Sequence, residues 1–343
     1  MPMKRTEPTL QQWKDLFEAA GRIKQAKPWE YLYENNIVMI QMPKRTEPIF
    51  CSVLGADGEA FAVLVYPDRR SFAERNRLFS MQGLPFYVLA CRQNCFSCNF
   101  GNRGDLSNEE YRIVKDLGLR FRGENQWIYF NTYKTGRAPW LPDSEEAGIL
   151  IDALQNFFMA FRSYVTGKLK VDFKNGKILC RFYSEEKKLW FNAEVNMPAI
   201  PEPVFRHVVV TDELAMARLK AMKKTDCRME ADLLYLPVPI REKKGEVPFY
   251  PELCLIADRD SGTILDQCAL DGEKAEEDVL LTMLDGYVRK AGRPCSIEVR
   301  DEAAQNLIED FCEKCGIAVE RSASLRVIDS FVDGFLNNCS GKL

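Results

Sequence analysis

The sequence contains only one histidine, His207, in 343 residues. This histidine stands just before the apolar run VVV, with no serine or cysteine nucleophile beside it. We interpret it as a structural histidine, although a role as a general base stays open. The sequence also lacks a nucleophile–base pair, a glycine-rich phosphate loop and a set of four zinc ligands. These absences leave the chain without a familiar catalytic motif.

Long apolar runs and blocks of basic residues are also missing. No window approaches the roughly 20 apolar residues that span a bilayer, and the start, MPMKRTEPTLQQW, has no apolar signal-peptide region. The 47 Lys and Arg residues are interleaved with 50 Asp and Glu residues, which gives a net charge of −3. Coating a nucleic acid requires clustered positive charge. We therefore expect a cytoplasmic protein that binds a protein or a small anionic ligand, and neither a membrane nor a nucleic acid.

Cysteine is plentiful, with twelve residues that we expect to be reduced thiols. Cys91, Cys95 and Cys98 have the spacing C-x3-C-x2-C, which is known from iron–sulfur clusters that cleave S-adenosylmethionine. CFSCNF alternates as a strand, however, which places Cys95 and Cys98 on opposite faces. We predict strand packing and no cluster. Cys312 and Cys315 form C-x2-C on an expected helix, where packing is favoured and metal binding stays open.

Residues 1–166 are predicted to form an α+β domain with antiparallel strands. Thr9 and Gln12 form a capping box before an amphipathic helix. Asp57-Gly58 marks a hairpin turn between two apolar strands. PFYVLAC and CFSCNF are predicted as further strands, and a strong helix is expected over residues 143–165.

The pattern changes after this helix. Residues 167–200 are predicted as an antiparallel three-stranded meander or connector, with a turn at Asn175-Gly176. The proline-rich MPAIPEPVF places the main boundary near residues 197–205. Residues 201–343 then alternate strands and helices, beginning with the expected strand RHVVV, as in an α/β domain. Asp212 and Asp301, in two similar strand–Asp-Glu–helix units, are expected to be N-caps.

The most unusual local composition is RFRGENQWIYFNTYKTGRAPW, residues 120–140. Guanidinium groups stack on aromatic rings, and such a surface can hold an anion, a base or a peptide. We predict a ligand-binding surface made of Arg122, Trp127, Arg137 and Trp140. The alternative is that the arginine stems simply cover a small aromatic core.

The run CFSCNFGNRGDLS…LGLRFRGENQWIYFNTYKTGRAPW resembles a family of uncharacterised bacterial two-domain proteins. The stretch LCLIADRDSGTIL…CSIEVRDEAAQNLIEDFCEKCGIAVE looks like the second domain of such proteins. This resemblance implies the domain organisation and implies no activity.

Two functions of different classes follow. The first is a non-catalytic binding or adaptor protein without a cofactor. The alternative is a phosphodiesterase or nuclease dependent on Mg²⁺ or Mn²⁺, because residues 251–336 are similar in element order to a shortened ribonuclease-H-like domain.

Such nucleases hold two metal ions with carboxylates from the first strand, a later strand end and the last helix. The matching residues would be Asp258, Asp301 and Asp329, with Asp260 and Asp333 nearby. However, Asp258 is expected at a turn, Asp301 is expected to be an N-cap, and residues 251–336 lack the third strand of the hairpin. We therefore expect a ribonuclease-H-like arrangement that does not cleave nucleic acid.

Overall fold

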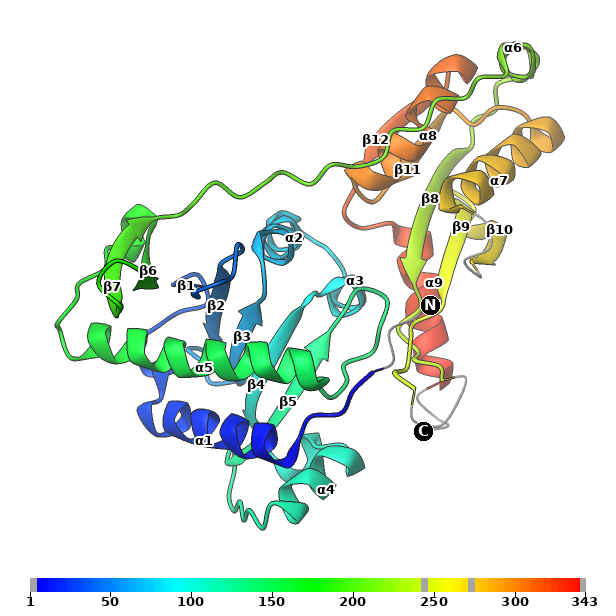
Figure 1. The fold of residues 1–343 in the computed structure, drawn as a ribbon. Coiled ribbons are helices and arrows are strands. Elements are labelled where there is room, and N and C mark those ends of the chain that lie inside the picture. Colours follow the sequence, from blue (N-terminus) through cyan, green and yellow to red (C-terminus); the bar gives the residue numbers. More distant parts are fainter. Residues whose placement is uncertain (1–4, 242–245, 271–274, 340–343) are drawn as a thin grey trace. The chain divides into compact units, whose positions relative to one another are not determined.

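The computed structural model describes residues 5–241, 246–270 and 275–339, which form two compact units (Figure 1). Both units are discontinuous in sequence. The first comprises residues 1–76, 93–134 and 139–202, and the second comprises residues 77–92, 135–138 and 203–343. The domains expected from the sequence were contiguous. They therefore placed residues 77–92 and 135–138 in the N-terminal domain, although these segments belong to the second unit.

The first unit contains a seven-stranded sheet with the order β5-β4-β3-β2-β1-β6-β7. All neighbouring strands are antiparallel except β1 and β6, which are parallel. The strands are β1 (Val38–Gln41), β2 (Ile49–Leu54), β3 (Phe61–Tyr66), β4 (Cys95–Gly101), β5 (Trp127–Tyr133), β6 (Lys177–Ser184) and β7 (Leu189–Asn196). The predicted hairpin around Asp57-Gly58 is confirmed as the β2–β3 connection.

Helices α1 (Leu10–Ala26) and α5 (Ser144–Val165) lie across one face of this sheet (Figure 1). Both begin with the capping boxes that satisfy the free N–H groups of a first helical turn, Thr9 with Gln12 and Asp143 with Glu146. On the opposite face, Phe72 of α2 (Arg69–Ser80) stacks on Phe50 with ring centroids 4.4 Å apart. The remaining helical elements of this unit are α4 (Asn108–Asp116) and the 3₁₀ turns Pro28–Glu30, Arg103–Asp105 and Phe173–Asn175.

Three expected strands are wrong. PFYVLAC is helix α3 (Phe86–Arg92), whose buried Tyr87, Val88 and Cys91 recur at helical spacing after Pro85. The connector of residues 167–200 has two strands, β6 and β7, instead of three. The segment expected as its first strand instead folds back on the end of α5, where the N–H of Leu169 donates to the carbonyl of Ser163. RHVVV runs along the helix of residues 302–315, where the N–H of Val208 donates to Asn306 O.

The second unit contains a five-stranded sheet with the order β10-β9-β8-β11-β12. The strands are β8 (Arg228–Tyr235), β9 (Glu252–Asp258), β10 (Thr263–Leu270), β11 (Ser296–Val299) and β12 (Ala318–Arg321). The first three are antiparallel, and β8, β11 and β12 are parallel. In chain order this is 3-2-1-4-5, with helices after the third, fourth and fifth strands, which is the ribonuclease-H-like arrangement. The third hairpin strand is therefore present, because β8 is the first strand.

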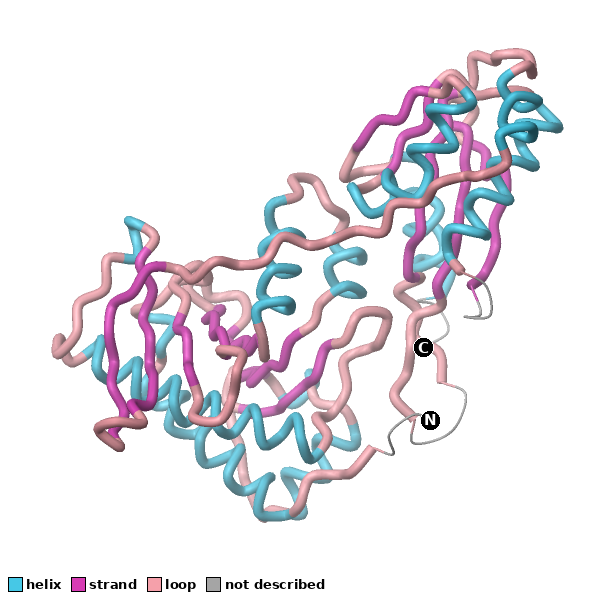
Figure 2. The backbone as a smooth tube through the Cα atoms, turned by 45° about the horizontal axis from the view of Figure 1, so that its top comes forward, coloured by secondary structure: helices cyan, strands magenta, loops and turns pink. Residues whose placement is uncertain are grey.

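Helices cover both faces of this sheet (Figure 2). Side chains of α6 (Glu213–Lys220), α7 (Glu276–Ala291) and α8 (Glu302–Cys315) share one core with one face. Side chains of α3 and α9 (Arg326–Cys339) share a second core with the other face. Within the described ranges, every helix falls short of the length and apolar character that crossing a membrane requires.

Candidate functional site: a buried arginine among carboxylates

Strand β8 carries two acidic residues inside the second unit. Glu230 and Asp232 are only 0% and 1% exposed. Met229, Ala231 and Leu233 belong to the core under α6, α7 and α8. Because side chains alternate along a strand, the two carboxylates point to the other face, on which α3 and α9 pack.

Arg300 follows β11 and is completely buried among these groups. Its Nε donates to Asp232 at 2.7 Å, and its Nη2 donates to Asp329 of α9, also at 2.7 Å. The guanidinium further donates to the carbonyl of Ala323 and to the hydroxyl of Tyr87. Burial is the largest single influence and lowers the pKa of Arg300, but Asp232, Tyr87 and Asp329 together more than offset it and hold this pKa above its usual value.

Asp329 and Tyr87 complete this arrangement. The Tyr87 hydroxyl donates to Asp329 at 3.0 Å, and the Leu325 N–H donates to the same carboxylate at 2.9 Å. Glu230 accepts the N–H groups of Val327 and Ile328 in the first turn of α9. A carboxylate is favourable at a helix N-terminus, so Glu230 anchors α9 to the sheet.

Asp301, the next residue in the chain, belongs to a second ionic cluster, which it forms with Arg92 and Arg77. Its carboxylate caps α8 by accepting the N–H of Ala304 and pairs with Arg92 at 2.6 Å and Arg77 at 3.2 Å. Burial raises the pKa of Asp301, but Arg92 and the backbone N–H more than offset this and hold it below its usual value. Asp301 is therefore occupied by capping and ion pairing.

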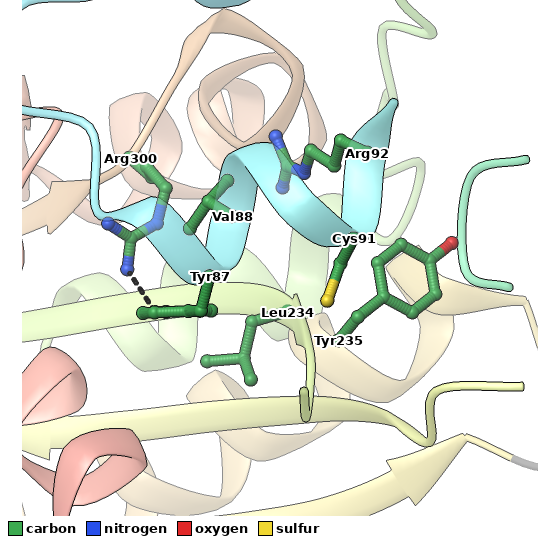
Figure 3. Close-up of a pocket in the computed structure, with 7 residues that line it drawn as sticks. All are labelled: Tyr87, Val88, Cys91, Arg92, Leu234, Tyr235 and Arg300. Atoms are coloured by element: carbon green, nitrogen blue, oxygen red, sulfur yellow. Dashed lines mark hydrogen bonds between the residues drawn. The ribbon is translucent and has the colours of Figure 1, made fainter. Parts of the chain in front are cut away.

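Helix α3 covers the sheet beside Arg300 (Figure 3). Tyr87, Val88, Cys91 and Arg92 of this helix face Leu234, Tyr235 and Arg300 across a crevice too narrow to hold a water molecule. The Arg92 guanidinium also donates to the carbonyl of Leu233 on β8. The helix and its arginine thus close the face of the sheet that carries the buried charges.

The predicted nuclease residues do not converge. Asp258 ends β9, the second strand, and its side chain accepts the N–H groups of Asp260 and Ser261 in the following turn. The first-strand carboxylates are instead Glu230 and Asp232, which were not predicted from the sequence. Asp301 and Asp329 lie in separate ionic clusters, and Asp333 is exposed, while Asp260 pairs with Arg228.

A signal for the missed residues exists in the sequence. RMEADLLY places two acids at alternate positions of an otherwise apolar strand, and IEVRDE places an arginine at the end of another. Charges within buried strands are expensive unless they are paired. The ion pair between Asp232 and Arg300 could not be predicted, because it depends on β8 and β11 being neighbours in the sheet.

The residues present do not fit a two-metal site. Catalytic metal pairs need carboxylates around the ions, but the guanidinium of Arg300 fills the space between Asp232 and Asp329. Arginine carries donors only and does not lose its proton in proteins. Among the described residues, no group of three or more His, Cys, Asp or Glu residues is placed to hold a metal ion.

The four residues of the predicted Arg/aromatic surface are divided between the two units. Arg122 is exposed and Trp127 is half-buried in the first unit, where Trp127 packs on Phe121. Trp140 pairs with Thr132 beside β5. Arg137 belongs to the second unit, where its backbone pairs with Phe249.

A different arginine forms a cation–π contact within the first unit. The guanidinium of Arg103 lies 3.8 Å from the ring centroid of Tyr111 and 5.9 Å from that of Trp127. Tyr111 is 38% exposed, so the aromatic surface is open to solvent at this point.

The cysteine motif is split as well. Cys98 belongs to the core under α1 and α5 and Cys95 to the core on the opposite face, which confirms the predicted alternation. Cys91 lies on α3 in the second unit. Cys312 and Cys315 are both buried in the core of the second unit.

Two family models match the chain, each described as a domain of unknown function: DUF7309 over residues 13–181 and DUF6930 over residues 215–336. The chain is thus a two-domain protein built from two domains of unknown function. Comparison with curated proteins gives no significant match.

Solved structures similar to the chain include viral integrases. The HTLV-2 integrase catalytic core domain in complex with magnesium, in its trimeric form, is 15% identical, with 34% of this chain and 70% of that chain covered and a TM-score of 0.25. A simian T-cell lymphotropic virus intasome in complex with PP2A regulatory subunit B56 gamma is 14% identical, with 36% and 45% covered and a TM-score of 0.24. The fold assignment of the second unit comes from its own strand order and directions.

Proposed function

We propose that the second unit is a non-catalytic binding module with a ribonuclease-H-like fold, and that the protein acts as an adaptor. The observation that carries this proposal is the position of Arg300, which joins Asp232 to Asp329 through two 2.7 Å hydrogen bonds. In a nuclease, positions on the first strand and the last helix hold metal ions. Here a permanent side-chain cation neutralises the same two carboxylates.

Two further features support this proposal. Glu230, the other first-strand carboxylate, is committed to the backbone of α9. Helix α3 lies over the same face of the sheet, and Tyr87 bonds directly to Asp329 and Arg300. A phosphodiester would therefore find neither a metal ion nor an open surface at this place.

The proposed partner is a protein or a small anionic ligand. In the first unit, the contact surface is proposed to be the aromatic and basic cluster of Arg103, Tyr111, Trp127 and the neighbouring Arg122. Arginine and aromatic side chains dominate the energetics of many interfaces. Here all four side chains are at least partly exposed, and Arg103 is in cation–π contact with Tyr111 and Trp127.

The test compares divalent-ion binding and cleavage in the wild type and an Arg300→Gly variant. Thermal unfolding of the wild type should not change on addition of Mn²⁺ or Mg²⁺, and single-stranded, duplex and hybrid substrates should remain intact. Arg300→Gly frees Asp232 and Asp329, so Mn²⁺ should now stabilise the variant, because an ion that binds only the folded state raises its stability.

Arg289→Gly is the matched control, since this exposed arginine of α7 pairs with Asp285 of the same helix and makes no ion pair with Asp232 or Asp329. It should gain no metal dependence. If Arg300→Gly does not fold, Arg300→Lys keeps a cation in place and should also bind no Mn²⁺. Cleavage by the wild type that is abolished in Asp232→Asn, with folding intact, would establish the nuclease alternative and overturn the proposal.

A further inference from the structure

We infer that Cys227 and Cys295 form a redox-active thiol pair that is oxidised by small-molecule disulfides to an intramolecular disulfide. The two cysteines stand immediately before β8 and β11, which are neighbouring parallel strands of the second unit. They are 68 positions apart in sequence (295 − 227), but the sheet places them side by side.

One contact joins the two cysteines directly, and a second joins Cys295 to the residue before Cys227. The N–H of Cys295 donates to the carbonyl of Cys227 at 2.9 Å. The Sγ of Cys295 lies 3.6 Å from the carbonyl oxygen of Asp226, the residue before Cys227. Neighbouring strands lie about 4.8 Å apart, and a disulfide accommodates Cα separations of about 4.4–6.8 Å. The backbone is therefore already close enough for an S–S bond.

The flanking chain holds this geometry in place. The N–H of Arg293 donates to Lys223 O, and the N–H of Thr225 donates to Arg293 O, so the two segments run together before the strands begin. Cys227 packs against the core that contains Met229, two positions further along β8. Ile297, two positions after Cys295, belongs to the same core, so alternation directs both cysteine side chains toward the same face.

Solvent access separates this pair from the other cysteines of the unit. Both Cys227 and Cys295 are partly exposed, whereas Cys312 and Cys315 are buried. Cys254 and Cys268 also face each other, on β9 and β10, but Cys254 is fully buried and burial raises its pKa to about 12. A thiol needs to ionise before it can attack a disulfide, so Cys254 is poorly suited to this exchange.

The reaction proceeds in two exchanges. The Cys295 thiolate attacks one sulfur of the small disulfide, which forms a mixed disulfide and releases one small thiolate. The Cys227 thiolate then attacks the Cys295 sulfur, which forms the Cys227–Cys295 bond and releases the second small thiolate. The two cysteine sulfurs are oxidised, the small disulfide is reduced by two electrons, and its two thiolates take up the protons from the two cysteines.

Tyr287 on α7 contributes to the second exchange. Burial raises the pKa of Cys227, and a hydrogen bond with the Tyr287 hydroxyl partly offsets this effect by favouring the thiolate. Tyr287 is therefore a positioning residue for the step in which Cys227 attacks.

The experiment uses the full chain with Cys268→Ser, because exposed Cys268 would otherwise take up the oxidant by itself. After incubation with oxidised glutathione, free thiols and bound glutathione are measured, and peptides are mapped under non-reducing conditions. The expected result is the loss of two thiols, no retained glutathione and a cross-linked pair of peptides containing Cys227 and Cys295. Dithiothreitol should restore both thiols.

Single replacements in this background separate the two steps. Cys227→Ser should trap one glutathione on Cys295, since the resolving thiol is absent. Tyr287→Phe should prolong the mixed disulfide while its pH profile shifts to higher pH. The inference is overturned if Cys227 and Cys295 stay reduced, or if each retains its own glutathione, while the protein remains folded.

Discussion

At the scale of single residues, the main feature is a set of charges buried within the second unit. Arg300 forms ion pairs with both Asp232 and Asp329, and Arg92 and Arg77 form ion pairs with Asp301. Ionised groups in a protein interior are tolerated only where they are paired and hydrogen-bonded. Removing one partner is consequently more damaging than removing an exposed ion pair.

Arg300→Met should destabilise the protein by about 3–5 kcal/mol, because it leaves Asp232 and Asp329 without their counter-charge. Urea unfolding measures this change. Arg289→Met removes an exposed helical pair and should cost less than about 1 kcal/mol. An Arg300→Met protein as stable as the Arg289→Met protein would contradict the assigned role of the buried pair.

Glu252 gives the second unit a predictable dependence on pH. Burial, and then the nearby Glu276, raise the pKa of Glu252 to about 7, with Tyr235 and Arg92 acting in the opposite direction. The folded state therefore holds a proton that the unfolded state has lost above its ordinary pKa of 4.5. This contribution is fully present below pH 4.5 and is lost as the pH rises through 7.

Glu252→Gln should remove this dependence. Allowing for solvent screening, the variant should be about 1 kcal/mol more stable than the wild type at pH 8 and similar to it at pH 5. Chemical denaturation at both pH values measures the difference. Glu276→Gln should show a smaller effect in the same direction, and equal pH slopes for Glu252→Gln and the wild type would refute this prediction.

At the scale of elements, the sequence predicted helices better than strand pairing. The capping boxes at Thr9 and Asp143 are local, so the helices that follow them could be predicted. PFYVLAC was wrongly predicted as a strand, because a short apolar run suits either a strand or a helix and only packing against β8 distinguishes the two. The role of β8 as first strand was missed for a different reason: the ribonuclease-H-like part was expected to start at residue 251, and only long-range pairing shows that β8 lies between β9 and β11.

Two glycines test how tightly the elements are held. Gly292, at the end of α7, has a φ of 105°, and a Cβ there would lie 2.5 Å from the carbonyl oxygen of Lys223. Gly292→Ala should therefore destabilise the second unit by on the order of 2 kcal/mol or more. Gly21 lies within α1 with no atom near its added Cβ, so Gly21→Ala should stabilise the first unit by about 0.5–1 kcal/mol. The midpoint of thermal unfolding should fall in Gly292→Ala and rise in Gly21→Ala. A shift of both midpoints in the same direction would contradict the predicted difference between the two positions.

At the scale of the whole molecule, the chain forms two units whose sequences interleave. Composition and the proline-rich segment indicated a two-part chain, but they could not show that residues 77–92 and 135–138 belong to the second unit. This membership depends on long-range contacts. Gly136 donates its N–H to Cys91 O and accepts from the N–H of Tyr250, so both inserted segments are tied into the unit by backbone hydrogen bonds.

A chain of residues 203–343 alone should consequently fold poorly. It lacks α3, so Leu234, Leu255 and Val332 lose the cover of Tyr87 and Val88, and Asp301 loses both of its arginines. Exposed apolar surface and an unpaired buried carboxylate should give strong binding of a hydrophobic dye and a broad, less cooperative unfolding transition. In the full chain, Val88→Ser should produce a milder form of the same change, whereas Val204→Ser, at a side chain 97% exposed, should have no effect. The prediction is contradicted if the 203–343 fragment unfolds in a sharp thermal transition with the same midpoint as the full chain. In that case residues 77–92 and 135–138 would not be needed for the stability of the second unit.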